Sequence, residues 1–157
     1  MIALQRGLEM AHTLHGPLPL DLSPLAQRLG LEIVPWRFRG RLREVIVDAV
    51  IGIDDRLPSP WVRWLTAHAI GHHLLHTGTW LYLDSWQWVA RVKAERQAEE
   101  FAAGLFMPST PALLALGPAT LARRLGIPEA KALWSWPYWT LLSNPQPPHD
   151  GGKGSKT

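Results

Sequence analysis

The stretch Leu65-Thr-Ala-His68-Ala69-Ile-Gly-His72-His73-Leu-Leu-His76 decides how the rest of the chain folds. Most of its residues are good helix formers, and two histidines, His68 and His72, stand four positions apart. On a helix this spacing places both imidazoles on one face, one turn apart, where they can hold a single ion. The sequence therefore predicts a helix over residues 59–76 that carries part of a metal site.

The spacing matches the zinc-binding motif H-E-x-x-H at every position but one, because Ala69 stands where the glutamate should be. A catalytic zinc ion typically takes three protein ligands and keeps one position for water, so a carboxylate should come from elsewhere in the chain. A second helix, predicted over residues 87–106, offers Glu95 and Glu99 one turn apart. Either could ligate the metal while the other accepts a hydrogen bond from a ligand histidine. His73 and His76, toward the end of the first helix, could also ligate, since His72 and His76 are again four positions apart.

The composition describes one soluble domain without covalent cross-links. The chain has 157 residues, enough to bury a core of its own. It has no cysteine, which excludes disulfides and thiolate metal sites and is typical of the cytoplasm. No apolar run reaches the roughly 20 residues of a membrane span, so we expect a cytoplasmic protein without membrane contact. The net charge of +3 specifies no partner. We expect residues 1–142 to form a single domain and residues 143–157 to be a disordered tail.

Apolar periodicity and turn residues predict an α+β fold. Strands are expected near residues 31–36, 44–47 and 50–54, with a tight turn at residues 48–49. Helices are expected near residues 2–15, 23–30, 59–76, 87–106, 110–116, 118–125 and 128–136. We expect a small antiparallel three-stranded sheet packed against a helical bundle, with the metal between the two long helices.

Two segments resemble the ImmA/IrrE family of zinc metallopeptidases. The first, residues 63–76, is similar to the family helix R-F-T-L-A-H-E-L-G-H-x-L-L-H. The second, residues 95–108, is similar to the family helix E-x-E-A-N-x-F-A-A-x-L-L-M-P. The strand–turn–strand before the first helix also looks like the family. Two motifs in the right order and spacing outweigh the alternative that the histidines are hydrogen-bonded core residues.

The resemblance implies a zincin-like fold and a zinc ion, or alternatively manganese, held by His68, His72 and a glutamate. Glu95 matches the first glutamate of the family motif and is the expected third ligand. Gln97 replaces the second family glutamate, and Glu99 stands where asparagine or aspartate is usual. Glu99 is therefore both a candidate hydrogen-bonding partner of a ligand histidine and the alternative third ligand.

In such enzymes the residue at the position of Ala69 takes a proton from water and passes it to the leaving amine. Alanine does neither, and losing a general base typically costs about 10²–10⁴-fold in rate. The chain should therefore bind metal and substrate but turn over little. Two explanations stay open: an engineered Glu-to-Ala change that inactivates the enzyme, and a natural pseudo-protease that binds or sequesters its target.

The resemblance also implies a substrate, a transcriptional repressor of the helix-turn-helix type whose cleavage derepresses stress-response or mobile-element genes. Zincins usually bind an extended peptide as an added strand at a sheet edge. The predicted strand that contains Val50, Ile51, Gly52 and Ile53 directly precedes the metal helix. We therefore expect this strand to be the substrate-binding edge.

A DNA-binding module is the competing function. Residues 121–134 read as a helix, a glycine turn and a second helix, with Arg123, Arg124 and Lys131 nearby. The second helix, however, carries apolar residues such as Trp134 where base-reading polar residues should stand. Direct nucleic-acid binding is therefore not the expectation.

Overall fold

The structure is a computed structural model that describes residues 2–76, 80–83 and 92–144. The described helices are α1 (Ile2–Ala11), α2 (Ser23–Arg28), α3 (Ser59–Leu75), α4 (Val92–Leu105), α5 (Pro111–Leu114), α6 (Pro118–Leu125) and α7 (Glu129–Ser143). The described strands are β1 (Glu32–Trp36), β2 (Leu42–Val47), β3 (Val50–Asp54) and β4 (Trp80–Leu83). The predicted α+β class is confirmed. The start predicted for the second long helix, residues 87–91, and the predicted tail beyond residue 144 lie outside the described residues. None of the described helices is both long and apolar enough to cross a membrane.

The sheet differs from the expected antiparallel arrangement in two ways. Within the described residues it has four strands in the order β1-β3-β2-β4. β1 runs parallel to β3, while β2 is antiparallel to both of its neighbours, β3 and β4. The predicted tight turn between β2 and β3 is present, with Asp48 in the left-handed region at φ 52°. The sheet is mixed because this hairpin folds back and inserts β3 between β1 and β2.

The prediction that Val50, Ile51, Gly52 and Ile53 form a substrate-binding edge is wrong. β3 lies inside the sheet, paired with β1 on one side and with β2 on the other. Because its backbone donors and acceptors already pair with these neighbours, a peptide cannot add to it as a further strand. The terminal strands of the described sheet are β1 and β4.

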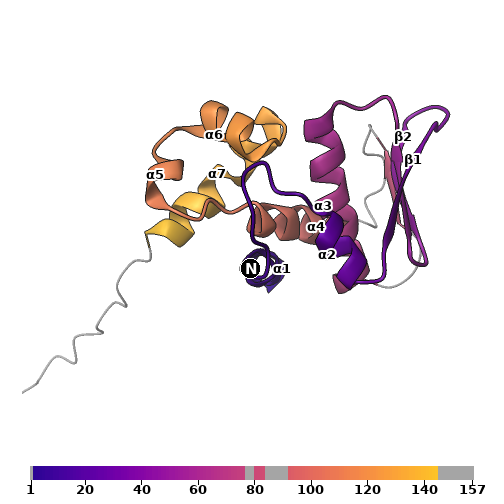
Figure 1. The fold of residues 1–157 in the computed structure, drawn as a ribbon, viewed down its shortest axis with the longest axis horizontal. Helices are drawn as coiled ribbons and strands as arrows, with labels where there is room; N and C mark the ends of the chain where they lie inside the picture. The colour runs from indigo at the N-terminus through magenta and orange to yellow at the C-terminus, as the bar shows by residue number, and fades with distance from the viewer. Residues whose placement is uncertain (1, 77–79, 84–91, 145–157) are drawn as a thin grey trace, which may run out of the picture.

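The metal helix α3 lies between the sheet and α4, as Figure 1 shows. Gly71, one residue before His72, permits the close approach of α4. A Cβ at Gly71 would meet the side chain of Phe101 on α4 at 3.1 Å, tighter than an ordinary contact. This packing sets the start of α4, which carries Glu95, opposite the histidines of α3.

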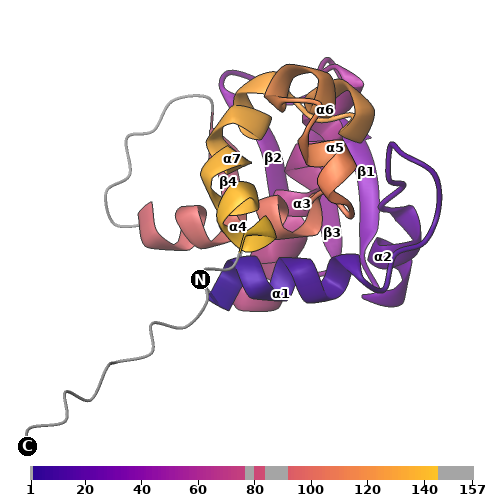
Figure 2. The same ribbon diagram turned by 90° about the vertical axis from the view of Figure 1, so that its left-hand side faces the viewer.

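Helix α1 packs against the other side of α4 (Figure 2). Two glycines make this contact a close one. A Cβ on Gly7 would collide with the backbone of Phe101, and a Cβ on Gly104 would collide with the backbone of Leu4. α4 is therefore held from two sides, by α3 and by α1.

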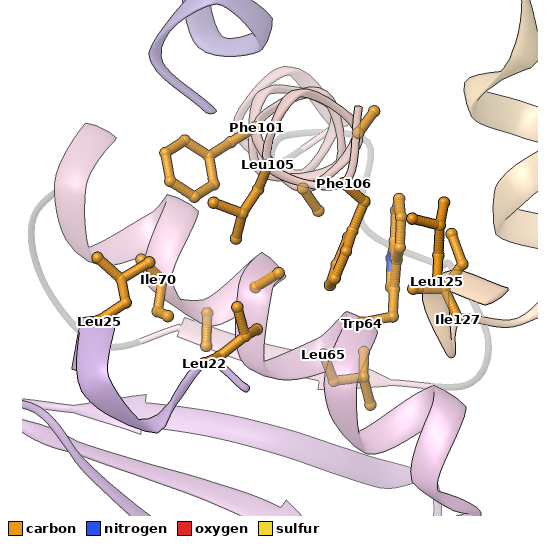
Figure 3. Packing of buried hydrophobic residues seen from close by; sticks show 14 of the residues in the cluster. Leu22, Leu25, Trp64, Leu65, Ile70, Phe101, Leu105, Phe106, Leu125 and Ile127 are labelled. Carbon is orange, nitrogen blue, oxygen red and sulfur yellow. The ribbon is translucent and has the colours of Figure 1, made fainter. Parts of the chain in front are cut away.

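Trp64 joins three parts of the chain in one core. Its side chain is completely buried and stacks on Phe106, the residue after α4, with ring centroids 5.8 Å apart. Figure 3 shows Leu125 and Ile127, from the α6–α7 region, on the other side of the same indole. The C-terminal helices are thereby packed onto α3 and α4 in a shared apolar core.

Helix α7 continues further than predicted. The sequence predicts an end near residue 136, because Pro137 removes a backbone donor and disfavours helix at the preceding residue. The helix instead runs through Pro137 to Ser143. Trp139, one turn from its end, is completely buried and donates its Nε1–H to the carbonyl oxygen of Ala103 at 2.8 Å. Tertiary packing thus outweighs the local cost of the proline.

Candidate metal centre

Two helices bring three potential ligand atoms together. His68 and His72 lie one turn apart on α3, and Glu95 lies in the first turn of α4. Glu95 Oε2 is 2.9 Å from His68 Nε2 and 3.2 Å from His72 Nε2. All three side chains are buried. The structure thus brings together the three residues that the sequence predicts as metal ligands.

The chemistry of this donor set fits a divalent cation such as zinc. Two imidazole nitrogens and one carboxylate oxygen are a known set for catalytic zinc, with the fourth position left to water. At metal–ligand distances of about 2.0–2.1 Å, two atoms bound tetrahedrally to one ion lie about 3.4 Å apart. The separations of 2.9 and 3.2 Å are close to that value. The three side chains can therefore close around one ion with small movements.

Glu44 on β2 supports His68 from the far side of its ring. Glu44 Oε2 lies 2.9 Å from His68 Nδ1, and both side chains are only 1% exposed. A carboxylate on the outer nitrogen of a ligand histidine fixes the ring and makes the inner nitrogen a better donor. No sequence pattern predicts this role for Glu44. The sequence places Glu44 at the start of the predicted strand 44–47, but it does not give the contact with α3.

The two histidines differ in charge when no metal is bound. Burial alone would lower the pKa of His68, but the charge and hydrogen bond of Glu44, with a hydrogen bond to Glu95, raise that pKa to about 10. Burial lowers the pKa of His72 to about 4. Burial alone would raise the pKa of Glu95, but hydrogen bonds from both histidines lower it to about 2. At neutral pH His72 is ready to ligate, whereas His68 carries a proton that a metal must displace.

Metal binding should therefore release about one proton per ion at pH 7. The proton comes from His68, because its raised pKa keeps the metal-free ring charged while a metal requires the neutral ring. Titration calorimetry with zinc in two buffers of different ionisation enthalpy measures this number. Zinc binding without proton release would show that His68 is already neutral in the metal-free protein.

Replacing Glu44 with glutamine should weaken zinc affinity by about 10–100-fold, since the amide keeps the shape but not the charge that supports His68. The Glu44→Gln variant should also release fewer protons, because the pKa of His68 falls when the carboxylate is removed. Competition with a zinc-chelating dye measures the affinity. Glu32→Gln, at an exposed position of β1, is the matched control and should leave both quantities unchanged.

His72 is supported by a second histidine rather than by a carboxylate. Its Nδ1 is 3.1 Å from His76 Nδ1, and His76 Nε2 is 2.8 Å from Gln97 Oε1. Because an amide oxygen only accepts, His76 Nε2 carries the proton, which leaves His76 Nδ1 as an acceptor. In the metal-free site His72 Nε2 donates to Glu95, whereas a metal bound at Nε2 requires the His72 proton on Nδ1, where it is donated to His76 Nδ1. Gln97, a departure from the family motif, thus helps to set the tautomer of a candidate ligand.

Glu99 lies beside the metal position with partners that the sequence does not predict. Its Oε1 is 4.0 Å from His68 Nε2, too far for a hydrogen bond. Its carboxylate accepts from Trp64 Nε1–H at 2.9 Å and from Lys131 Nζ at 3.0 Å. The sequence predicts that Glu99 accepts a hydrogen bond from a ligand histidine. In the structure Glu44 is the carboxylate that accepts from His68.

Ala69, the position of the missing glutamate, follows His68 on α3. Its side chain is completely buried and belongs to the apolar core. A methyl group neither takes nor delivers a proton, so position 69 contributes packing alone.

A cavity of about 530 Å³ opens next to Glu95, between α4 and α7. Its lining residues are Val92, Glu95, Arg96, Glu99, Lys131, Trp134 and Tyr138. The charged side chains in this lining all make ion pairs with groups of opposite sign. Trp134 and Tyr138 form an aromatic wall, with ring centroids 5.3 Å apart. The cavity therefore offers a charge-balanced, partly aromatic surface beside the metal position.

Comparison with known proteins agrees with this geometry. Residues 32–131 match the family model of the IrrE N-terminal-like domain, which describes a peptidase family. The matched span includes the whole described sheet, α3, α4 and the first turn of α7. No curated protein matches the chain. Because the matched span covers well over half of the chain and contains all three candidate ligands, this protein belongs to the family of IrrE N-terminal-like metallopeptidases.

Proposed function

We propose that this protein is a zinc-dependent endopeptidase of the IrrE type whose target is a helix-turn-helix transcriptional repressor, and that Ala69 leaves this chain able to bind but not to cleave. The observation that carries the proposal is the cluster of His68, His72 and Glu95, built on two helices and supported by Glu44. Family membership supports a metallopeptidase-type activity. Removal of such a repressor would derepress stress-response or mobile-element genes, which requires a cytoplasmic protein.

The residues of the metal centre have different roles in the proposed reaction. A bound zinc ion would polarise the scissile carbonyl and lower the pKa of water. His68, His72 and Glu95 would hold that ion, and Glu44 keeps the ring of His68 oriented. Residue 69 supplies no group for proton transfer, a loss that typically costs about 10²–10⁴-fold in rate. The chain therefore holds its target at an assembled centre and turns over slowly.

Ala69 itself has two explanations within this proposal. An engineered replacement of glutamate is favoured by the ligand set, which is brought together as an active enzyme requires. A natural pseudo-protease is favoured by Gln97 and Glu99, which depart from the family motif and have contacts of their own. Restoring glutamate at position 69 separates the two.

A target peptide can pair with a terminal strand of the sheet. Of the two terminal strands, β4 lies next to β2, the strand that carries Glu44. β4 is therefore the edge we propose in place of β3. The cavity beside Glu95 would then receive one side chain of the peptide. Its aromatic wall of Trp134 and Tyr138 suits a large apolar side chain.

Trp134→Ala should weaken the binding of such a peptide about tenfold, because truncating an aromatic contact at a binding site typically costs more than about 1 kcal/mol. Fluorescence anisotropy measures the binding of two labelled peptides that differ only in carrying phenylalanine or aspartate at one position. The loss of affinity is expected for the phenylalanine peptide, whose side chain suits the aromatic cavity. Leu133→Ala, which removes an exposed apolar neighbour outside the cavity lining, is the control. An equal loss of peptide affinity in Trp134→Ala and Leu133→Ala would contradict a role for the cavity in binding.

The proposed function is tested with a purified helix-turn-helix repressor, chosen first from the genes near the one that encodes this chain. The zinc-loaded chain should form a complex with the repressor and leave it uncut over hours. Treatment with EDTA should weaken the complex, because the target is held at the metal centre. A repressor bound equally well with and without metal, or not bound at all, would contradict the proposal.

DNA binding remains the second candidate because α6 and α7 form a helix–turn–helix around Gly126. The contacts of α7 argue against it. Lys131 pairs with Glu99, and Trp139 is turned into the core. Helix α7 is thus packed onto α4 rather than presented to a groove. Binding to duplex DNA with a steep dependence on salt concentration would revive this function.

A further inference from the structure

Glu99 is held beside the metal position by donors from two different helices. Trp64 on α3 donates to Oε2 at 2.9 Å, and Lys131 on α7 donates to Oε1 at 3.0 Å. Trp64 is fixed, because it is completely buried and stacked on Phe106 (Figure 3). One carboxylate oxygen is therefore anchored in the core, and the position of the other depends on Lys131.

Lys131 is itself held in a defined place. Its ammonium nitrogen lies 5.7 Å from the ring centroid of Trp61 and 5.6 Å from that of Trp64, within cation–π range. The side chain is only 18% exposed. Two indole rings and one carboxylate thus hold a single cation at the first turn of α7. A solvated surface lysine would have no such surroundings.

The oxygen that Lys131 holds is the one that faces the metal position. Glu99 Oε1 is 4.0 Å from His68 Nε2. Two ligand atoms on one tetrahedral ion lie about 3.4 Å apart, so a shift of roughly half an ångström would bring Oε1 to ligand spacing. A fourth protein ligand would close the site, as in structural zinc sites, and would remove the position that a catalytic site leaves open.

We infer that Lys131 is a positioning residue that keeps Glu99 out of the coordination sphere and so keeps the metal site open to substrate. This inference rests on the proposed metal site. Lys131 acts by occupying Glu99 Oε1 with a hydrogen bond and by opposing a cation at that oxygen with its own charge. Helix α7 supplies no ligand, but through Lys131 it limits the number of carboxylates that coordinate the metal to one.

Lys131→Met tests the inference, because methionine keeps the length and the contact with the indoles but donates no hydrogen bond. The cobalt(II)-loaded protein reports on the open position through its visible absorption spectrum. Acetohydroxamate should change the spectrum of the unaltered chain by binding at that position. In the Lys131→Met variant acetohydroxamate should bind at least about tenfold more weakly, and zinc about tenfold more tightly, as Glu99 becomes a ligand.

Three further variants separate ligation from charge. Lys93→Met removes a positive charge from an exposed position of α4, outside the cavity lining, and should respond to acetohydroxamate like the unaltered chain. The double variant Lys131→Met with Glu99→Gln should regain the response, because an amide is a poor ligand for zinc. Lys131→Gln keeps a donor and should give an intermediate response, which tests the inference if the methionine variant does not fold.

Each outcome of this set is decisive. Equal acetohydroxamate responses and equal zinc affinities for the unaltered chain and Lys131→Met overturn the inference but leave the metal site intact. An equal loss of the acetohydroxamate response in Lys93→Met, or no recovery in the double variant, overturns it as well, since ligation by Glu99 then does not explain the change. If the unaltered chain fails to bind cobalt, or binds it without responding to acetohydroxamate, the proposed function fails instead.

Discussion

The zinc-loaded Ala69→Glu variant should cleave the helix-turn-helix repressor that we propose as the target about 10²–10⁴-fold faster than the chain with alanine. The gain is large because the three candidate metal ligands are already brought together. Glu95 lies within 3.2 Å of both histidine Nε2 atoms, and Glu44 holds the ring of His68. Glutamate at position 69 adds only the missing proton acceptor. Mass spectrometry of the repressor fragments over time measures the rate, with fluorescent casein as a second substrate.

Ala69→Gln is the control for this variant, because glutamine has the size of glutamate without its basicity. It should stay as slow as the alanine form. Position 69 is completely buried, so the melting temperature of both variants must show that they fold. A folded, zinc-loaded Ala69→Glu variant that cleaves neither the repressor nor casein would identify the chain as a natural pseudo-protease.

His72→Ala should weaken zinc binding by more than about 100-fold, beyond the effect expected for a residue that only supports a ligand. Zinc at about 100 times its dissociation constant stabilises a protein by about 2.7 kcal/mol, so it should raise the melting temperature of the unaltered chain by about 5–10 °C. The variant should show no such shift. Differential scanning calorimetry with and without zinc measures it, and Glu95→Gln should behave in the same way.

His73 offers the matched control for this experiment. It is the next residue on α3, but its side chain is exposed and stands apart from the cluster. His73→Ala should therefore keep the full zinc-dependent shift. A His72→Ala variant that is stabilised by zinc as strongly as His73→Ala would exclude His72 as a ligand.

The part of the site that follows from helical periodicity could be predicted from the sequence. Four residues separate His68 from His72, and one turn of helix places them on the same face wherever the helix packs. Glu95 could be predicted as a ligand because two motifs stand in the order and spacing of the family. Glu44 could not be found in this way, because its contact with His68 depends on which strand lies over α3, and local patterns do not contain that information.

Strand order explains the main error in the same terms. The alternation of side chains predicts that residues 50–54 form a strand, but it does not say which strands lie on either side. Pairing of β1 with β3 joins residues far apart in the sequence and turns an expected edge into an interior strand. The end of α7 was missed for a related reason, since burial of Trp139 outweighs the local effect of Pro137.

The glycine contact between α1 and α4 has a practical consequence for defining the smallest working fragment. Helix α1 lies before the segment shared with the family, yet it braces the helix that presents Glu95. A fragment trimmed to residues 32–131 would keep every candidate ligand and lose this brace, together with most of α7. The metal affinity of this fragment would then be that of a site whose helix α4 is no longer held by α1, not that of the native centre. A fragment whose boundaries are chosen by homology alone would therefore give a metal affinity below that of the native site.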